Sequence, residues 1–139
     1  MNDPLNVLKE EIKNRARIYV HIYRELSGEL GQDQAAEILK KALYARGQEK
    51  GRQLASKLGK PDPIKLAASF MEGKDEMDAF GHEIAEKRAD HAVLRLNRCP
   101  LVEAWNEAGV SPEEIRRMCD IACRVDFGKF EAAGYKLSF

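Results

Sequence analysis

The fold class depends on residues 82–98, which read HEIAEKRADHAVLRLNR. Leu94 and Leu96 alternate with polar residues, and this period of two is typical of a strand with one buried face. The pair Asp90 and His91 can form the turn between two such strands. We therefore predict a β-hairpin over residues 82–98. A helix is the alternative, because the apolar residues of the first half also fit one helical face.

The chain before this segment is predicted to be helical. Apolar residues recur at three- and four-residue steps over residues 5–27 and again over residues 33–58, which predicts two long helices. Asp62 is a typical N-cap and Pro63 a typical first-turn residue, so a short third helix is expected to begin there and to end near Gly73.

Two glycines lie on the apolar stripe of the second predicted helix. Gly47 and Gly51 are four residues apart, and each costs a helix about 1 kcal/mol relative to alanine. Together they form a notch in the helix surface. We interpret the notch as the place where another helix approaches closely, and space for a ligand is the alternative.

The chain after the hairpin is predicted to contain two further helices. The first covers residues 101–108, and the second begins at the capping box that Ser111 starts, with Gly128 near its end. Residues 135–139 alternate like a strand, which is expected either to be buried at the terminus or to continue beyond Phe139. The sequence therefore predicts an α+β fold, with a helical N-terminal half, then a small antiparallel sheet with two further helices.

Composition limits the function classes. The 139 residues fit a single domain over 1–139, and 44% of them are hydrophobic, so a core can form without disulfides. With 23 basic and 23 acidic residues, the chain lacks the basic excess of a nonspecific nucleic-acid binder. No segment resembles a signal peptide or a membrane span, and three cysteines are an odd count for a secreted scaffold, so we expect a cytoplasmic protein. A homo-oligomer is left open.

Cys99 is the principal candidate for a reactive residue. It lies where the predicted hairpin ends and a helix begins, so its thiol can meet unpaired backbone N–H groups and the positive end of a helix dipole. These groups stabilise a thiolate, and Arg98 adds a positive charge. We therefore expect Cys99 to be the most reactive of the three thiols. The alternative is a small cysteine buried at a junction, because free cysteine is among the most buried residue types.

Other acidic and sulfur-containing side chains are further candidates. Glu103 follows Cys99 on the short helix and can accept a proton near the thiol. Asp120 follows Cys119 and is a candidate general base or ligand, with a surface salt-bridge row as the alternative. Cys119 and Cys123 are four residues apart, a spacing that could hold a metal ion together with Cys99 or a histidine but is more typical of a core face.

Two residues with ring side chains, a histidine and a tryptophan, are the remaining candidates for the functional site. His82 begins the hairpin and can reach the region of Cys99 if the strands pair as predicted. Trp105 lies on the short helix and is expected in the core beneath the hairpin. We include both among the candidates for contacting a small-molecule substrate.

Two segments carry a family resemblance: RCPLVEAW at residues 98–105 and MCDI at residues 118–121. They resemble the L-2-amino-thiazoline-4-carboxylic acid hydrolase family, which has a helical N-terminal half, a strand that runs into an R-C-P-type turn, and a cysteine–acid pair on a later helix. The resemblance extends from about residue 5 to the end. Family members continue into a further strand with another cysteine, which this sequence lacks. If that cysteine belongs to the site, we expect a truncated chain or an altered site.

The resemblance implies the opening of a small cyclic amidine that bears a carboxylate, which gives an N-carbamoyl cysteine. Cys99 or a metal-bound water would attack the ring carbon, so a divalent metal is left open as a cofactor. Glu103 or Asp120 would move protons. Arg98 or Arg95 would hold the carboxylate, because arginine matches its planar geometry.

Three functions therefore remain open. The first is the ring-opening hydrolase, for which we expect Cys99, Cys119 and either Asp120 or Glu103 to converge on one pocket. The second is a non-catalytic module that binds a small ligand or a metal through the same cysteines. The third is a helical interaction protein whose cysteines belong to the core.

Overall fold

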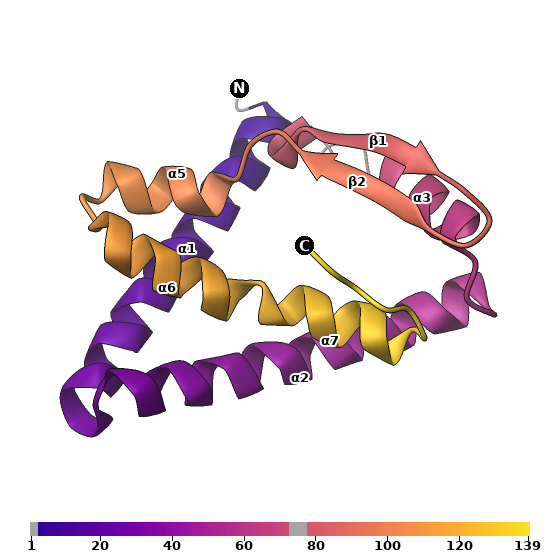
Figure 1. Ribbon diagram of the computed structural model, residues 1–139. Helices are drawn as coiled ribbons and strands as arrows, with labels where there is room; N and C mark the ends of the chain where they lie inside the picture. The colour runs from indigo at the N-terminus through magenta and orange to yellow at the C-terminus, as the bar shows by residue number, and fades with distance from the viewer. Residues whose placement is uncertain (1–2, 73–77) are drawn as a thin grey trace. The chain divides into compact units, whose positions relative to one another are not determined.

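The computed structural model describes residues 3–72 and 78–139, and the chain is mainly helical with one small sheet (Figure 1). The elements in chain order are α1 (Pro4–Leu30), α2 (Gln32–Leu58), α3 (Pro63–Glu72), β1 (His82–Lys87), β2 (Ala92–Leu96), α5 (Pro100–Glu107), α6 (Pro112–Ala122) and α7 (Arg124–Ala132). This order confirms the α+β prediction. Among the described residues, no helix contains a stretch long and apolar enough to cross a lipid bilayer.

The chain divides into two units, and α1 contributes to both. Unit 1 comprises Met1–Arg17 and Asp62–Gly109, and therefore holds the start of α1, α3, the two strands and α5. Unit 2 comprises Ile18–Pro61 and Val110–Phe139, and holds the rest of α1 with α2, α6 and α7. That the chain is one domain stays a prediction.

The hairpin of unit 1 is an antiparallel pair of strands with α3 packed against both of them (Figure 1). The strands start with His82 opposite Leu96, and a bulge shifts the register after Ile84. The amide of Arg88 donates to the carbonyl of His91 over 2.8 Å and closes the turn. The hairpin prediction is confirmed over the helix alternative, because cross-strand hydrogen bonds satisfy the backbone there.

The start of α3 follows a local capping rule. Asp62 accepts a hydrogen bond from the amide of Ile64 over 3.0 Å, so it caps α3 as predicted. The prediction that Gly73 ends this helix lies outside the described residues.

In the core of unit 1, Trp105 of α5 is completely buried, and its indole N–H donates to the carbonyl of Ala16 on α1 over 2.8 Å.

Unit 2 is organised by a close contact between α2 and α7, which lie side by side in Figure 1. A Cβ atom added at Gly47 would lie 2.1 Å from the carbonyl oxygen of Val125, and one added at Gly51 would lie 2.2 Å from that of Lys129. On α7, a Cβ at Gly128 would lie 2.2 Å from the carbonyl oxygen of Tyr44. The glycine notch is therefore filled by a helix, as the first interpretation predicted.

Two predictions for the C-terminal region are wrong. Gly128 does not lie at a helix end, because α7 continues through it to Ala132. The final helical stretch is also split, since Cys123 has φ −65° and ψ −14° and the amide of Asp126 donates to its carbonyl in a tighter turn between α6 and α7.

Residues 135–139 form no strand. A strand requires a partner for its backbone groups, and the sheet in the described residues has only β1 and β2. The ring of Phe139 instead meets the edge of Phe127, with 5.5 Å between the ring centroids.

Candidate functional site

Cys99 occupies the N-cap of α5, as predicted. Its backbone is extended, with φ −137° and ψ 108°, and Pro100 takes the first turn. The expected interaction of the sulfur with free N–H groups is not formed, because the Cys99 side chain makes no capping hydrogen bond. The amide of Glu103 donates instead to the backbone oxygen of Cys99 over 3.0 Å. The half-buried thiol is thus placed at the helix start without being bonded to it.

The charged side chains next to Cys99 are paired with each other. The guanidinium of Arg98 donates to Glu103 through Nε and Nη2, each 3.0 Å from a carboxylate oxygen. Arg95 is paired across the hairpin through a single contact, with its Nη1 2.6 Å from Oε1 of Glu83. The two arginines expected to hold a substrate carboxylate therefore already have carboxylate partners, and Glu103 has its charge offset by Arg98.

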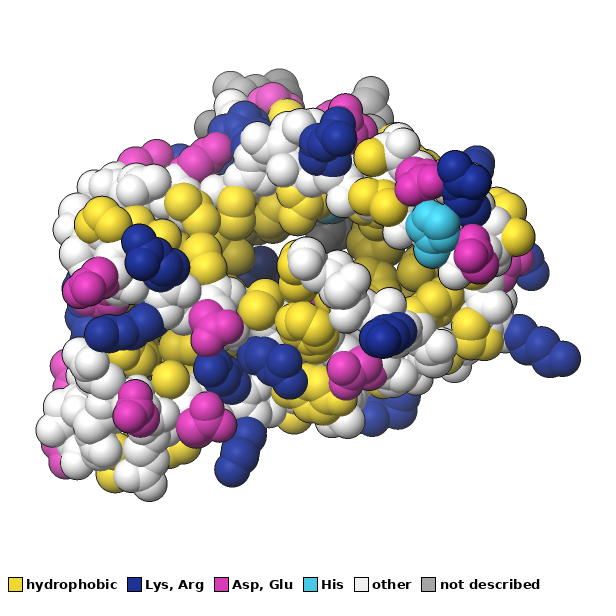
Figure 2. Space-filling model, viewed as in Figure 1, with side chains coloured by type: hydrophobic (Ala, Val, Ile, Leu, Met, Phe, Trp, Pro, Cys, Tyr) yellow, Lys and Arg dark blue, Asp and Glu magenta, His cyan; other side chains and the backbone are white. Residues whose placement is uncertain are grey.

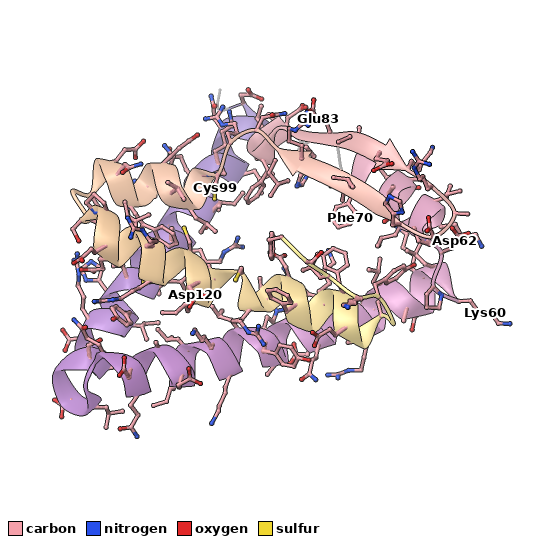
Figure 3. The ribbon with its side chains drawn as sticks, in the orientation of Figure 1. Lys60, Asp62, Phe70, Glu83, Cys99 and Asp120 are labelled. Atoms are coloured by element: carbon pink, nitrogen blue, oxygen red, sulfur yellow. The ribbon has the colours of Figure 1, made fainter. Side chains whose placement is uncertain are left out.

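The two ring-bearing candidates of unit 1 lie in packed surroundings. The ring of His82 stacks on Phe80 at 5.6 Å and meets the edge of Phe70 at 5.9 Å between centroids. Figure 3 shows Phe70 on α3 beneath the sheet, with Cys99 labelled beyond the end of β2. Complete burial of Trp105 confirms its expected place in the core. The substrate contacts proposed for His82 and Trp105 stay predictions.

Unit 2 carries the other two catalytic candidates on α6. Cys119 is exposed, so the expectation that it belongs to the buried face of this helix is wrong. That face is formed by Met118 and Ile121 instead. Cys123 is half-buried, and burial together with the charge of Asp120 raises the pKa of its thiol.

Asp120 forms an ion pair that the sequence did not predict. Its Oδ2 lies 3.0 Å from Nζ of Lys40, which is also 3.8 Å from Oε1 of Glu37 on α2. The hydrogen bond to Asp120 raises the pKa of Lys40 and keeps it cationic. Figure 3 shows Asp120 on the side of α6 that faces α2, so the pair links these two helices.

A cavity of about 450 Å³ opens beside this ion pair, which we name the α2–α6 groove. Its volume lies within the range of about 300–1,000 Å³ that is usual for small-molecule sites. The groove is lined mainly by polar side chains of α2, of α6 and of the first residue of α7: Glu37, Lys40, Lys41, Tyr44, Gln48, Asp120 and Arg124. It combines both signs of charge in one small volume.

The predicted convergence of the cysteines involves both units. Cys99 and Glu103 belong to unit 1, whereas Cys119 and Asp120 belong to unit 2. Their meeting in one pocket therefore stays a prediction. Within residues 3–72 and 78–139, no three histidine, cysteine or acidic side chains lie close enough together to hold a metal ion.

Comparison with known protein families identifies the family of this chain. The family model described as L-2-amino-thiazoline-4-carboxylic acid hydrolase matches residues 11–138, nearly the whole chain. This chain belongs to that family. No curated protein and no solved structure matches it. Membership in the L-2-amino-thiazoline-4-carboxylic acid hydrolase family confirms the resemblance of the two short segments, both of which lie inside the matched range.

In this family member, sequence reasoning missed the residues of α2 that face Asp120. Lys40, Tyr44 and Gln48 recur at four-residue steps and so share one side of α2. That side borders the buried stripe on which Gly47 lies. A polar row next to a helix-packing stripe was the available signal, but periodicity alone does not reveal which helix lies opposite.

Proposed function

We propose that this protein hydrolyses a small carboxylate-bearing cyclic amidine of the 2-amino-thiazoline-4-carboxylate type. The observation that carries the proposal is the family match over residues 11–138, because it includes both the R-C-P segment and the M-C-D-I segment. The proposal thus assigns to this chain the activity after which its family is named.

The reaction adds one water and changes no oxidation state. The nucleophile forms a bond to the ring carbon between nitrogen and sulfur, and the bond from this carbon to the ring sulfur breaks. The sulfur takes a proton and leaves as a thiol. Water then attacks the same carbon and displaces the nucleophile, which leaves a urea group. The product is N-carbamoyl cysteine.

In this proposal, Cys99 supplies the nucleophile. Its thiol is half-buried at the start of α5, where the helix dipole favours a negative charge. Attack by a cysteine divides one difficult hydrolysis into two easier steps. Arg98 precedes Cys99 in the chain and is paired with Glu103.

Asp120 and Glu103 are the proposed proton carriers. The carboxylate of Asp120 is well exposed and is bonded to Lys40 through one oxygen, so its other oxygen can reach a ligand. Cys119 precedes it on the same exposed part of α6 and belongs to the proposed set. Glu103 lies one turn after Cys99 and is held by Arg98.

The test is incubation of the purified protein with L-2-amino-thiazoline-4-carboxylate. We expect N-carbamoyl cysteine, identified by mass spectrometry, and one new thiol for each product molecule. Cys99→Ala should abolish product formation. Cys123→Ala is the matched control, because it removes a half-buried thiol from outside the proposed set. Unchanged activity of Cys99→Ala would remove the proposed nucleophile, and absence of product from the unaltered protein would refute the proposal.

A further inference from the structure

The α2–α6 groove has a cationic side and an anionic side, and this arrangement limits what it can bind. On the face shown in Figure 2, basic and acidic side chains lie next to one another over α2 and α6. Because charges of both signs line the same 450 Å³, a simple anion or a simple cation would meet repulsion as well as attraction. A ligand that carries both charges can satisfy both sides.

The cationic side is formed by Arg124 and Lys41. The guanidinium carbon of Arg124 lies 5.4 Å from the centroid of the Tyr44 ring and 4.8 Å from that of Phe127. Cation–π contacts of this kind leave the N–H donors of a guanidinium unused, so Arg124 can still bind a carboxylate through two parallel hydrogen bonds. In the part of the chain that the structure describes, neither Arg124 nor Lys41 has a carboxylate partner.

This availability distinguishes the groove from the arginines of unit 1. Arg98 and Arg95 are occupied by Glu103 and Glu83. A substrate carboxylate would have to displace an existing partner there, whereas at Arg124 it would replace only water. The comparison favours the groove as the place where a carboxylate is recognised.

The anionic side is formed by the carboxylates of Asp120 and Glu37, both of which are paired with Lys40. One oxygen of Asp120 is engaged by Lys40 at 3.0 Å, and its side chain is two-thirds exposed. The second oxygen is therefore able to accept a hydrogen bond from a cationic nitrogen. Asp120 and Arg124 are four residues apart at the junction of α6 and α7, so both charges belong to the same mouth of the cavity.

We propose that the α2–α6 groove binds a small zwitterion, with its carboxylate at Arg124 and Lys41 and its cationic nitrogen at Asp120. A cyclic amidine that bears a carboxylate has this charge pattern when the amidine is protonated. The proposal deepens the proposed function, and its choice of substrate rests on that function. It moves carboxylate recognition from the hairpin arginines to residues of α2 and α7.

The test measures binding and turnover separately. Calorimetry measures the binding of L-2-amino-thiazoline-4-carboxylate, the carboxylate probe. It also measures the binding of 2-amino-thiazoline, a shorter probe that lacks the carboxylate. Arg124→Gln and Lys41→Gln should each weaken binding of the carboxylate probe by about tenfold or more and leave binding of the shorter probe unchanged. Arg116→Gln is the control, because it makes the same change on an exposed side chain of α6 outside the groove.

The outcomes separate this inference from the proposed function. If the carboxylate probe binds through Arg124 and no product forms, the binding site in the groove is supported and the hydrolase function is not. If product forms while Arg124→Gln and Lys41→Gln bind the probe as tightly as the unaltered protein, the binding site in the groove is overturned and the hydrolase function is supported. Failure of the unaltered protein to bind the probe also overturns the groove. Because Lys41 is exposed, we expect Lys41→Gln to fold normally. It therefore tests the proposal even if Arg124→Gln fails to fold.

Discussion

Substitution of Gly47 by alanine should destabilise the contact between α2 and α7. The added methyl would lie 2.1 Å from the carbonyl oxygen of Val125 and 2.9 Å from the backbone nitrogen of Lys129. Because both are backbone atoms, no change of rotamer relieves the clash. The two helices must move apart by more than about 1 Å before these contacts become ordinary, and a packed interface transmits such a shift along its length.

The magnitude follows from two opposing effects. Overpacking of a core typically costs about 1–3 kcal/mol, and a clash with backbone on the facing helix belongs at the upper end of that range. Alanine is a better helix former than glycine by about 1 kcal/mol, which offsets part of this cost. We therefore expect Gly47→Ala to lower the free energy of unfolding by about 2 kcal/mol.

The assay is urea unfolding followed by far-ultraviolet circular dichroism, with Gly28→Ala as the matched control. Gly28 also lies inside a helix, but a Cβ atom there would meet nothing within 4 Å. The control should be neutral or stabilising by up to about 1 kcal/mol, because only the helix propensity changes. If Gly47→Ala unfolds at the same urea concentration as Gly28→Ala, the close helix contact is not what the glycine provides, and the reasoning is refuted.

Three further predictions concern local contacts. Ser111→Ala removes the N-cap of α6 and should cost about 1 kcal/mol in the same unfolding assay, with Ser111→Thr as the control that keeps the cap. Trp105→Phe removes the buried hydrogen bond to the carbonyl of Ala16 and should lower the free energy of unfolding by about 1–2 kcal/mol. A decrease no larger than that caused by substituting an exposed side chain would contradict this prediction. The hydrogen bond to Glu86 raises the pKa of His91 above 6.5, so its stabilising contribution is complete below that pH and is lost as the pH rises through the raised pKa. The difference in melting temperature between the unaltered protein and His91→Gln should shrink over that pH interval, and a constant difference would exclude the linkage.

Much of the local structure was predictable because its causes lie within a few residues. Alternation of Leu94 and Leu96 with polar neighbours, preceded by a turn at Asp90 and His91, predicted the hairpin that cross-strand hydrogen bonds stabilise. Ser111 and Pro112 fixed the start of α6 through a cap that contacts only the next turn. The position of Cys99 before a helix followed in the same way from Pro100.

The errors arose where a local pattern has several tertiary solutions. Gly128 was interpreted as a helix end, yet it is a contact glycine inside α7, because the same absence of a side chain serves either purpose. The spacing of Cys119 and Cys123 was interpreted as typical of a core face, but Cys119 is exposed because Met118 and Ile121 form the buried face of α6. Residues 135–139 alternate like a strand but have no strand to pair with.

The sequence by itself determined where the hairpin and the helices before α6 form and which residues carry sulfur, acid and base, since backbone propensity, capping and periodicity act over one or two turns. Only the tertiary structure decided which charges meet. The pairs of Lys40 with Asp120 and of Tyr44 with Arg124 join residues about 80 positions apart, and all four residues line the α2–α6 groove. Such contacts depend on helix rotation and separation, which the pattern of a single helix does not specify.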